Sequence, residues 1–192
     1  MKSVLISIRQ QWCSLIASGQ KAVEVRKTKP KMDTPFKVYI YCTKSKKKTR
    51  IDWMDEALGG GMVIGEFVCD RVYQYASDMF RSAPVEGTDI STEDMTKLSC
   101  LTAKELYEYE HSAEPKENSI YLVGVYGWHI SDLVIYDKPK PLSNFYKECA
   151  GLYNTGLCYE CEKAVGEECD CATNGRVFIT RPPQSWCYVE EL

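Results

Sequence analysis

The sequence predicts an α+β protein built as a small mixed β-barrel with a few short helices. Its apolar segments are short, rich in β-branched and aromatic residues, and separated by turn residues rather than joined into long helical patterns. The 13 tyrosines among 192 residues suit a β-rich core. A small barrel is the usual way to bury so many short strands, and the length suits one domain, residues 1–192, with an insertion at about 143–180.

The chain begins with an expected strand, helix and strand. Residues 4–8 are apolar and β-branched, which favours a strand. Residues 10–18 place apolar side chains at helical spacing, and Gly19 suits the end of that helix. Residues 21–27 alternate, which indicates a second strand with Glu24 and Arg26 on a common face. Lys21 begins on the other face, so it joins them only if the strand twists or bulges at its start.

Further strands and short helices follow in the middle of the chain. Strands are expected at residues 36–42 and, as one or two segments, at 62–75. Residues 51–58 suit a short helix, and 76–100 a loop with a short helix. Thr102 and Glu105 have the spacing of a capping box, which predicts a helix to about residue 109.

The last third combines strands with a segment of different composition. Residues 119–136 form a strand region that the prolines of residues 137–141 are expected to end. Residues 143–175 are acidic and rich in cysteine. Residues 185–190 suit a closing strand.

The most informative segment is residues 19–26, Gly-Gln-Lys-Ala-Val-Glu-Val-Arg. It brings Lys21, Glu24 and Arg26 together at the junction of a helix and a strand. The two cations offer donors to a phosphate or a base edge, and the carboxylate accepts from an amine. The alternative is an ion-pair ladder at the surface, which binds nothing and stabilises weakly.

The pattern G-x-K-x-x-E-x-R in this position resembles the signature of the ASCH domain, a family related to the PUA-like RNA-binding barrels. Residues 5–8, 65–68 and 185–189 fit the strands of that fold. The resemblance implies a PUA-like β-barrel of the bacterial or phage type with a cleft beside the first helix. The implied ligand is RNA or a modified nucleotide, bound at Lys21, Glu24 and Arg26, with Glu66 as a further ligand-binding candidate.

The same resemblance carries an alternative, because some small ASCH proteins are amidohydrolases of N4-acylated cytidine. Their proposed lysine corresponds to Lys21, the catalytic candidate here. Their threonine corresponds to Glu24, which is no equivalent, and their glutamate to either Glu66 or Glu105. A hydrolase needs Lys21 buried beside a hydroxyl or carboxylate. A binding protein is expected to leave it at the mouth of a basic groove.

Charge is distributed unevenly along the chain. The net charge is −3, yet residues 1–50 hold 13 Lys and Arg against 2 Asp and Glu. A basic loop over residues 44–50 follows a tyrosine-rich strand, which suits single-stranded nucleic acid; the alternative is a solvated loop. The candidate ligand-binding residues of this loop are Lys44, Lys46, Lys47 and Lys48.

Four cysteines lie within 14 residues in the C-terminal insertion, with the spacing C-x-x-C and C-x-C. Four thiolates close a tetrahedral zinc site and leave no open position, so a structural zinc in a zinc-knuckle-like insertion is expected. Alternatives are free thiols or a redox pair, and a loop ordered by zinc suits a protein-interaction adaptor. The expected metal ligands are Cys158, Cys161, Cys169 and Cys171, with Cys149 as a spare candidate.

No apolar run is long enough for a membrane span, and the N-terminus lacks a signal-peptide pattern, so a cytoplasmic protein without a membrane partner is expected. The sequence therefore predicts an RNA- or nucleotide-binding protein, with the amidohydrolase and the adaptor as alternatives. It leaves the oligomeric state open.

Overall fold

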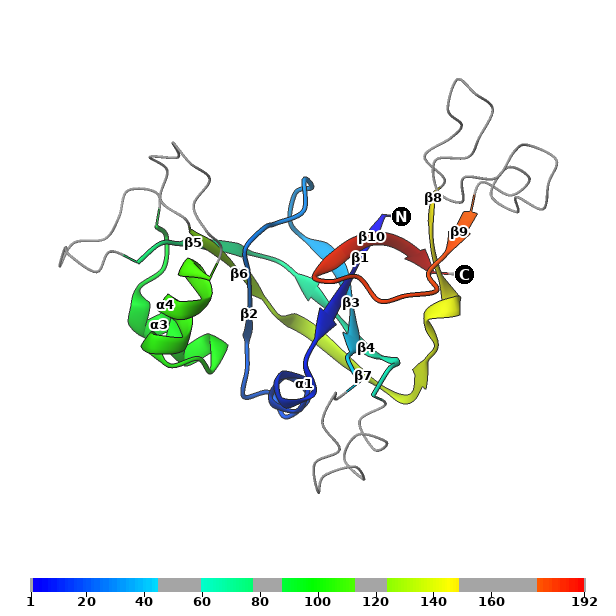
Figure 1. Cartoon of the computed structure of the whole chain (residues 1–192), viewed down its shortest axis with the longest axis horizontal. Coiled ribbons are helices and arrows are strands. Elements are labelled where there is room, and N and C mark those ends of the chain that lie inside the picture. Colours follow the sequence, from blue (N-terminus) through cyan, green and yellow to red (C-terminus); the bar gives the residue numbers. More distant parts are fainter. Residues whose placement is uncertain (1, 45–59, 78–87, 113–123, 149–175, 192) are drawn as a thin grey trace. The chain divides into compact units, whose positions relative to one another are not determined.

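The computed structural model describes residues 2–44, 60–77, 88–112, 124–148 and 176–191. In these ranges the chain has ten strands, three α-helices and one 3₁₀ turn (Figure 1). It divides into two compact units. Unit 1 comprises residues 1–8, 39–65 and 136–192, and unit 2 comprises residues 9–38 and 66–135.

A seven-stranded sheet has the order β7-β4-β3-β1-β10-β8-β9; β1, β8, β9 and β10 lie in unit 1, and the ranges of β3, β4 and β7 are divided between units 1 and 2. The N-terminal and C-terminal strands β1 and β10 pair antiparallel at its middle. The strands of the sheet are β1 (Ser3–Ile8), β3 (Phe36–Cys42), β4 (Val63–Cys69), β7 (Ser131–Lys140), β8 (Phe145–Glu148), β9 (Arg176–Phe178) and β10 (Trp186–Glu191). Its core cluster includes Leu5, Tyr39, Phe145 and Val189.

Unit 2 contains a three-stranded antiparallel sheet with the order β2-β6-β5. Its strands are β2 (Val23–Arg26), β5 (Val72–Tyr75) and β6 (Val125–His129). The helices are α1 (Gln10–Ala17), α3 (Thr92–Ser99) and α4 (Ala103–His111). Helix α3 packs against β2 and α4, and one apolar cluster joins sheet and helices through Val23, Met95 and Leu106 (Figure 1).

Where they fall on described residues, the predicted strands, the first helix and the α4 capping box are confirmed, whereas the short helix predicted at residues 51–58 lies outside the described residues. Thr102 accepts a hydrogen bond from the Glu105 amide, and the Glu105 carboxylate accepts one from the Thr102 amide. Helix α3 is the short helix expected within residues 76–100, and Ser91 caps it by accepting a hydrogen bond from the Asp94 amide.

Two expectations need correction. The described strands form a seven-stranded and a three-stranded sheet rather than one closed barrel. Strand β7 continues to Lys140 instead of ending at the prolines, because it lies at an edge of its sheet, where Pro139 costs no ladder hydrogen bond. The region expected as an insertion begins with β8 and contains β9 near its end, while residues 149–175 lie outside the described residues.

Candidate functional site

The end of helix α1 fixes the position of Lys21. Gly19 adopts a positive φ of 73°, which permits a Schellman turn. In this turn the Gly19 amide donates to the Ile16 carbonyl, and the Gln20 amide donates to the Leu15 carbonyl. The Lys21 amide donates to the same Leu15 carbonyl at 3.0 Å. Lys21 therefore precedes β2, which begins at Val23, so strand alternation does not determine where its side chain points.

Alternation along β2 separates its apolar and charged side chains. Val23 and Val25 belong to the apolar cluster shared with α3 and α4. Glu24 and Arg26 lie on the other face, where they stand opposite Trp128 and Tyr126 of β6. This arrangement follows the period of two that the sequence predicts.

Lys21, Glu24 and Arg26, which we call the charged triad, come together in unit 2. Lys21 Nζ lies 3.4 Å from Glu24 Oε2, and Arg26 Nη2 lies 3.0 Å from Glu24 Oε1. The three residues are only 3%, 6% and 9% exposed. Such burial contradicts a solvated surface ladder, because buried charges persist only when they are paired and hydrogen-bonded.

The ammonium group of Lys21 is surrounded by protein. It donates a 2.7 Å hydrogen bond to the carbonyl of Ser99, the last residue of α3, and lies 5.0 Å from the centre of the Trp12 ring. Carbonyls at a helix C-terminus lack partners within the helix and attract cations. Burial lowers the pKa of Lys21 below its ordinary value of 10.5, with the adjacent Glu24 acting in the opposite direction. Lys21 thus joins α3 to the start of β2.

Tyr109 of α4 lies within the electrostatic reach of the triad. Burial raises the pKa of its phenol, while the nearby Arg26 guanidinium lowers it and the Glu24 carboxylate raises it. Trp12, which the sequence did not single out as a site residue, borders the triad on the side of Lys21. The only sequence signal for Trp12 is its place on the apolar face of the first helix.

The clamped carboxylate of Glu24 is the chemically useful feature of the triad. Each of its oxygens faces one cation, and a carboxylate oxygen has lone pairs for a second donor. Its orientation is set by Lys21 on one side and Arg26 on the other. The arrangement can present a fixed acceptor to an amine or ring N–H, with a guanidinium beside it for an acceptor or a phosphate.

The other candidate residues are placed differently. Glu66 of β4 pairs with Lys37 at 2.7 Å, and Glu105 is engaged in the α4 capping box. Lys44 is exposed at the start of the basic loop. Lys46, Lys47 and Lys48 lie outside the described residues.

The predicted zinc ligands also lie outside the described residues, as does Cys149, so the zinc site stays a prediction. Within the described ranges, no three His, Cys, Asp or Glu side chains gather as a metal site needs. Cys69 and Cys187 belong to these ranges, and burial raises the pKa of their thiols to about 12 and about 11. Such thiols are poor ligands and poor nucleophiles at neutral pH.

One polar pair was not anticipated from the sequence. His129 Nδ1 lies 2.6 Å from Asp70 Oδ1, and this hydrogen bond lowers the pKa of Asp70. The two residues are 59 positions apart, so only the pairing of β5 with β6 brings them together.

In the described part of the chain, two β-sheets and short helices carry a buried charged triad just after the first helix. Residues 6–126, well over half of the chain, match the ASCH domain family. The chain belongs to that family, whose domains resemble RNA-binding domains in general.

Solved structures provide a second comparison. The chain is similar to the ASCH protein from Zymomonas mobilis, with a TM-score of 0.45 and 17% identity over 73% of each chain. A variant of that protein with one serine replaced by alanine gives a TM-score of 0.46 and 16% identity, covering 98% of this chain and 88% of the other. A variant with one tyrosine replaced by phenylalanine gives a TM-score of 0.41 and 18% identity, covering 74% of this chain and 77% of the other. No curated protein matches the sequence. No helix in the described part of the chain is long and apolar enough to cross a membrane.

Proposed function

We propose that this protein binds RNA or a modified nucleotide, and that Glu24 and Arg26 recognise a base of that ligand. The observation that carries the proposal is the buried carboxylate of Glu24, held between Lys21 and Arg26. A buried charged network costs desolvation that a well-packed apolar cluster does not, so its presence favours a role in recognition. The general likeness of ASCH domains to RNA-binding domains supports the same conclusion.

In this proposal the three residues have distinct tasks. Lys21 is a positioning residue, since its ammonium is engaged by the Ser99 carbonyl and by Glu24. Glu24 accepts from an exocyclic amine or a ring N–H. Arg26 donates to a base acceptor or to a phosphate, for which a guanidinium is well suited.

The test compares Glu24→Gln with the matched variant Glu108→Gln. Glu108 is 61% exposed on α4 and forms only a 3.8 Å surface pair with Lys104, so this control removes the same charge at a solvated position. We expect Glu24→Gln to abolish discrimination among 12-nucleotide RNAs that differ in one base, measured by fluorescence anisotropy, while Glu108→Gln retains it. Equal discrimination by both variants contradicts the proposal.

A second candidate function is hydrolysis of N4-acylated cytidine with Lys21 as base or nucleophile. One observation favours it: Lys21 is buried beside a carboxylate, and burial lowers its pKa toward the range in which a neutral amine forms. The test is the release of cytidine from a panel of N4-acylated cytidines, followed by chromatography, for the parent and for Lys21→Arg. An absence of turnover by the parent eliminates this candidate and leaves the binding proposal intact.

A further inference from the structure

The chain is strongly basic from the last residue of β2 to residue 31, and residues 26–31 all belong to the described ranges. Residues 26–31 read Arg-Lys-Thr-Lys-Pro-Lys and contain four cations and no acidic residue. Lys29 and Lys31 are exposed and Lys27 is half-buried. Because β2 is an edge strand of its sheet, this segment leaves the sheet at its border. We call Lys27, Lys29 and Lys31 the basic turn.

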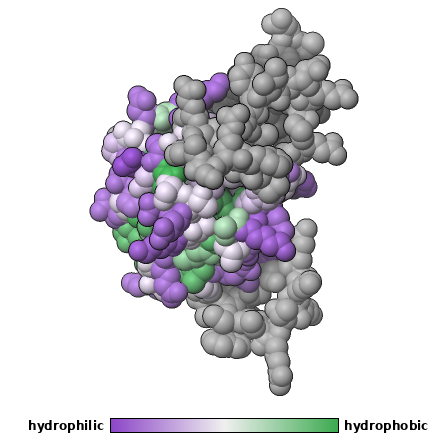
Figure 2. All heavy atoms as spheres, turned by 90° about the vertical axis from the view of Figure 1, so that its left-hand side faces the viewer, coloured by the Kyte–Doolittle hydropathy of each residue, from purple (hydrophilic) through white to green (hydrophobic). Residues whose placement is uncertain are grey.

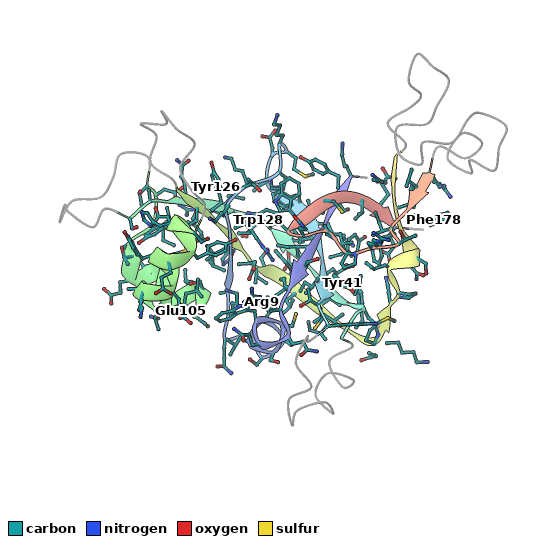
Figure 3. The ribbon with its side chains drawn as sticks, viewed as in Figure 1. Arg9, Tyr41, Glu105, Tyr126, Trp128 and Phe178 are labelled. Carbon is teal, nitrogen blue, oxygen red and sulfur yellow. The ribbon has the colours of Figure 1, made fainter. Side chains whose placement is uncertain are left out.

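Each of two tyrosines stands beside one lysine of the basic turn. Lys27 Nζ lies 5.5 Å from the ring centre of Tyr109 on α4, and Lys29 Nζ lies 5.5 Å from that of Tyr126 on β6. Both tyrosines are half-buried, so each ring is fixed by packing and keeps part of its surface in solvent. Figure 3 labels Tyr126 on β6, next to Trp128.

The strand register extends this surface across the sheet. Arg26, Tyr126 and Gln74 stand opposite one another on β2, β6 and β5, so they share the face that does not pack against α3 and α4. Gln74 is exposed, whereas Trp128 on the same face is fully buried and packs edge-on against Phe36. The accessible aromatic ring of this row is therefore that of Tyr126.

On the side where α3 and α4 lie, hydrophilic residues cover most of the described surface, with smaller hydrophobic patches between them (Figure 2). Tyr109 is the tyrosine of this side whose ring approaches the basic turn. A polymer that crosses the end of β2 meets Tyr109 and Lys27, then Lys29 and Tyr126.

Cations that alternate with fixed aromatic rings match the chemistry of single-stranded nucleic acid. Lysines neutralise phosphates, and a tyrosine ring stacks on any unpaired base. A duplex keeps its bases stacked on one another, so it gains from the lysines but not from the tyrosines. An acidic protein segment would pair with the lysines as RNA does, but it offers no flat bases to the two tyrosine rings.

We propose that the basic turn, together with Tyr109 and Tyr126, is the track on which single-stranded RNA enters the site of the charged triad. This inference rests on the proposed function, because the track leads to Arg26. The basic turn contacts two or three phosphates and the tyrosines stack one base each. Base identity is left to the triad.

The test uses fluorescein-labelled 12-nucleotide single-stranded RNA, the corresponding RNA duplex and cytidine monophosphate. The main variant replaces Lys27, Lys29 and Lys31 by Ala. Its matched control replaces Lys97, Lys104 and Lys138, which are also exposed, by Ala. If the three lysines contact phosphates, the slope of log affinity against log salt falls by about 0.7 for each, and the control leaves it unchanged.

The stacking part is tested by Tyr126→Leu, with Tyr126→Phe as its control because Phe retains the ring. Loss of one stacked base weakens the affinity of Tyr126→Leu for single-stranded RNA by at least about fivefold, whereas Tyr126→Phe keeps the parent affinity. Circular dichroism and the thermal midpoint verify that each variant is folded.

The outcomes separate this inference from the proposed function. Equal salt slopes for the two triple variants, or duplex binding as tight as single-strand binding, overturn the track. If cytidine monophosphate still binds and Glu24→Gln abolishes that binding, the proposed function stands without the track. If the triple variant of Lys27, Lys29 and Lys31 lowers the salt slope and Tyr126→Leu weakens binding, the track is supported. If Glu24→Gln also keeps its base discrimination, the role of the triad is refuted.

Discussion

The substitution Lys21→Met tests the account of the charged triad most directly. Methionine retains a long unbranched side chain but removes the ammonium group. The Ser99 carbonyl is then deprived of its 2.7 Å donor, and Glu24 keeps Arg26 as its remaining triad partner. The change therefore removes these two interactions and the contact of the ammonium with the Trp12 ring, without opening a large cavity.

The expected decrease in stability follows from these interactions. A hydrogen bond to a charged group contributes about 1.5–3 kcal/mol, and removing one partner of a buried ion pair costs about 3–5 kcal/mol. Against this, the variant no longer desolvates the ammonium, and this desolvation is the main cause of the lowered pKa of Lys21. We expect a net decrease of about 2–3 kcal/mol in the free energy of unfolding.

Urea unfolding followed by circular dichroism measures this difference. Lys104→Met is the matched control, since Lys104 is 82% exposed and its pair with Glu108 spans 3.8 Å. Surface pairs of this kind contribute about 0–1 kcal/mol. A decrease in Lys21→Met no larger than that in Lys104→Met refutes the account.

The pH dependence of the same difference has a defined sign. The folded pKa of Lys21 lies below 10.5, so between these two values the unfolded chain binds more protons than the folded one. The parent therefore gains stability relative to Lys21→Met as the pH rises from the folded pKa of Lys21 toward 10.5. A constant or decreasing difference over this range means that burial does not lower this pKa.

Three further predictions concern other parts of the chain. Gly19→Ala lowers the free energy of unfolding by about 1–2 kcal/mol, because the added Cβ meets no atom within 4 Å and the cost comes only from the positive φ of 73°. Gly19→Asn costs less, and equal stability of Gly19→Ala and the parent in urea unfolding contradicts the prediction. Protein purified without added zinc contains about one equivalent of the metal, bound by Cys158, Cys161, Cys169 and Cys171; elemental analysis near zero with four titratable thiols eliminates the site. Replacing Lys46, Lys47 and Lys48 by Ala lowers the salt slope of RNA binding by about 0.7 for each phosphate that the loop no longer neutralises, and an unchanged slope assigns this loop to solvent.

Local patterns in the sequence predicted many of the elements. The alternation of residues 21–27 predicted the two faces of β2, and Gly19 predicted the end of α1. The capping box at Thr102 predicted the start of α4. These features are set by backbone geometry and by neighbours within four residues, which a sequence displays directly.

How the strands group into sheets could not be predicted in this way. Nothing in the short strands specifies whether they form one barrel or two sheets, since both arrangements bury the same apolar faces. The register that places His129 beside Asp70 likewise depends on strands far apart in the chain.

The triad shows the same division. The sequence by itself determined that Lys21, Glu24 and Arg26 lie at the junction of a helix and a strand, because short-range periodicity and a glycine fix that junction. Only the tertiary structure decided that these charges are buried, since burial depends on α3 ending against Lys21 at Ser99. Desolvation by residues distant in sequence makes the three charges a buried network rather than a surface ladder, because the cost of burying a charge depends on everything that excludes water from it.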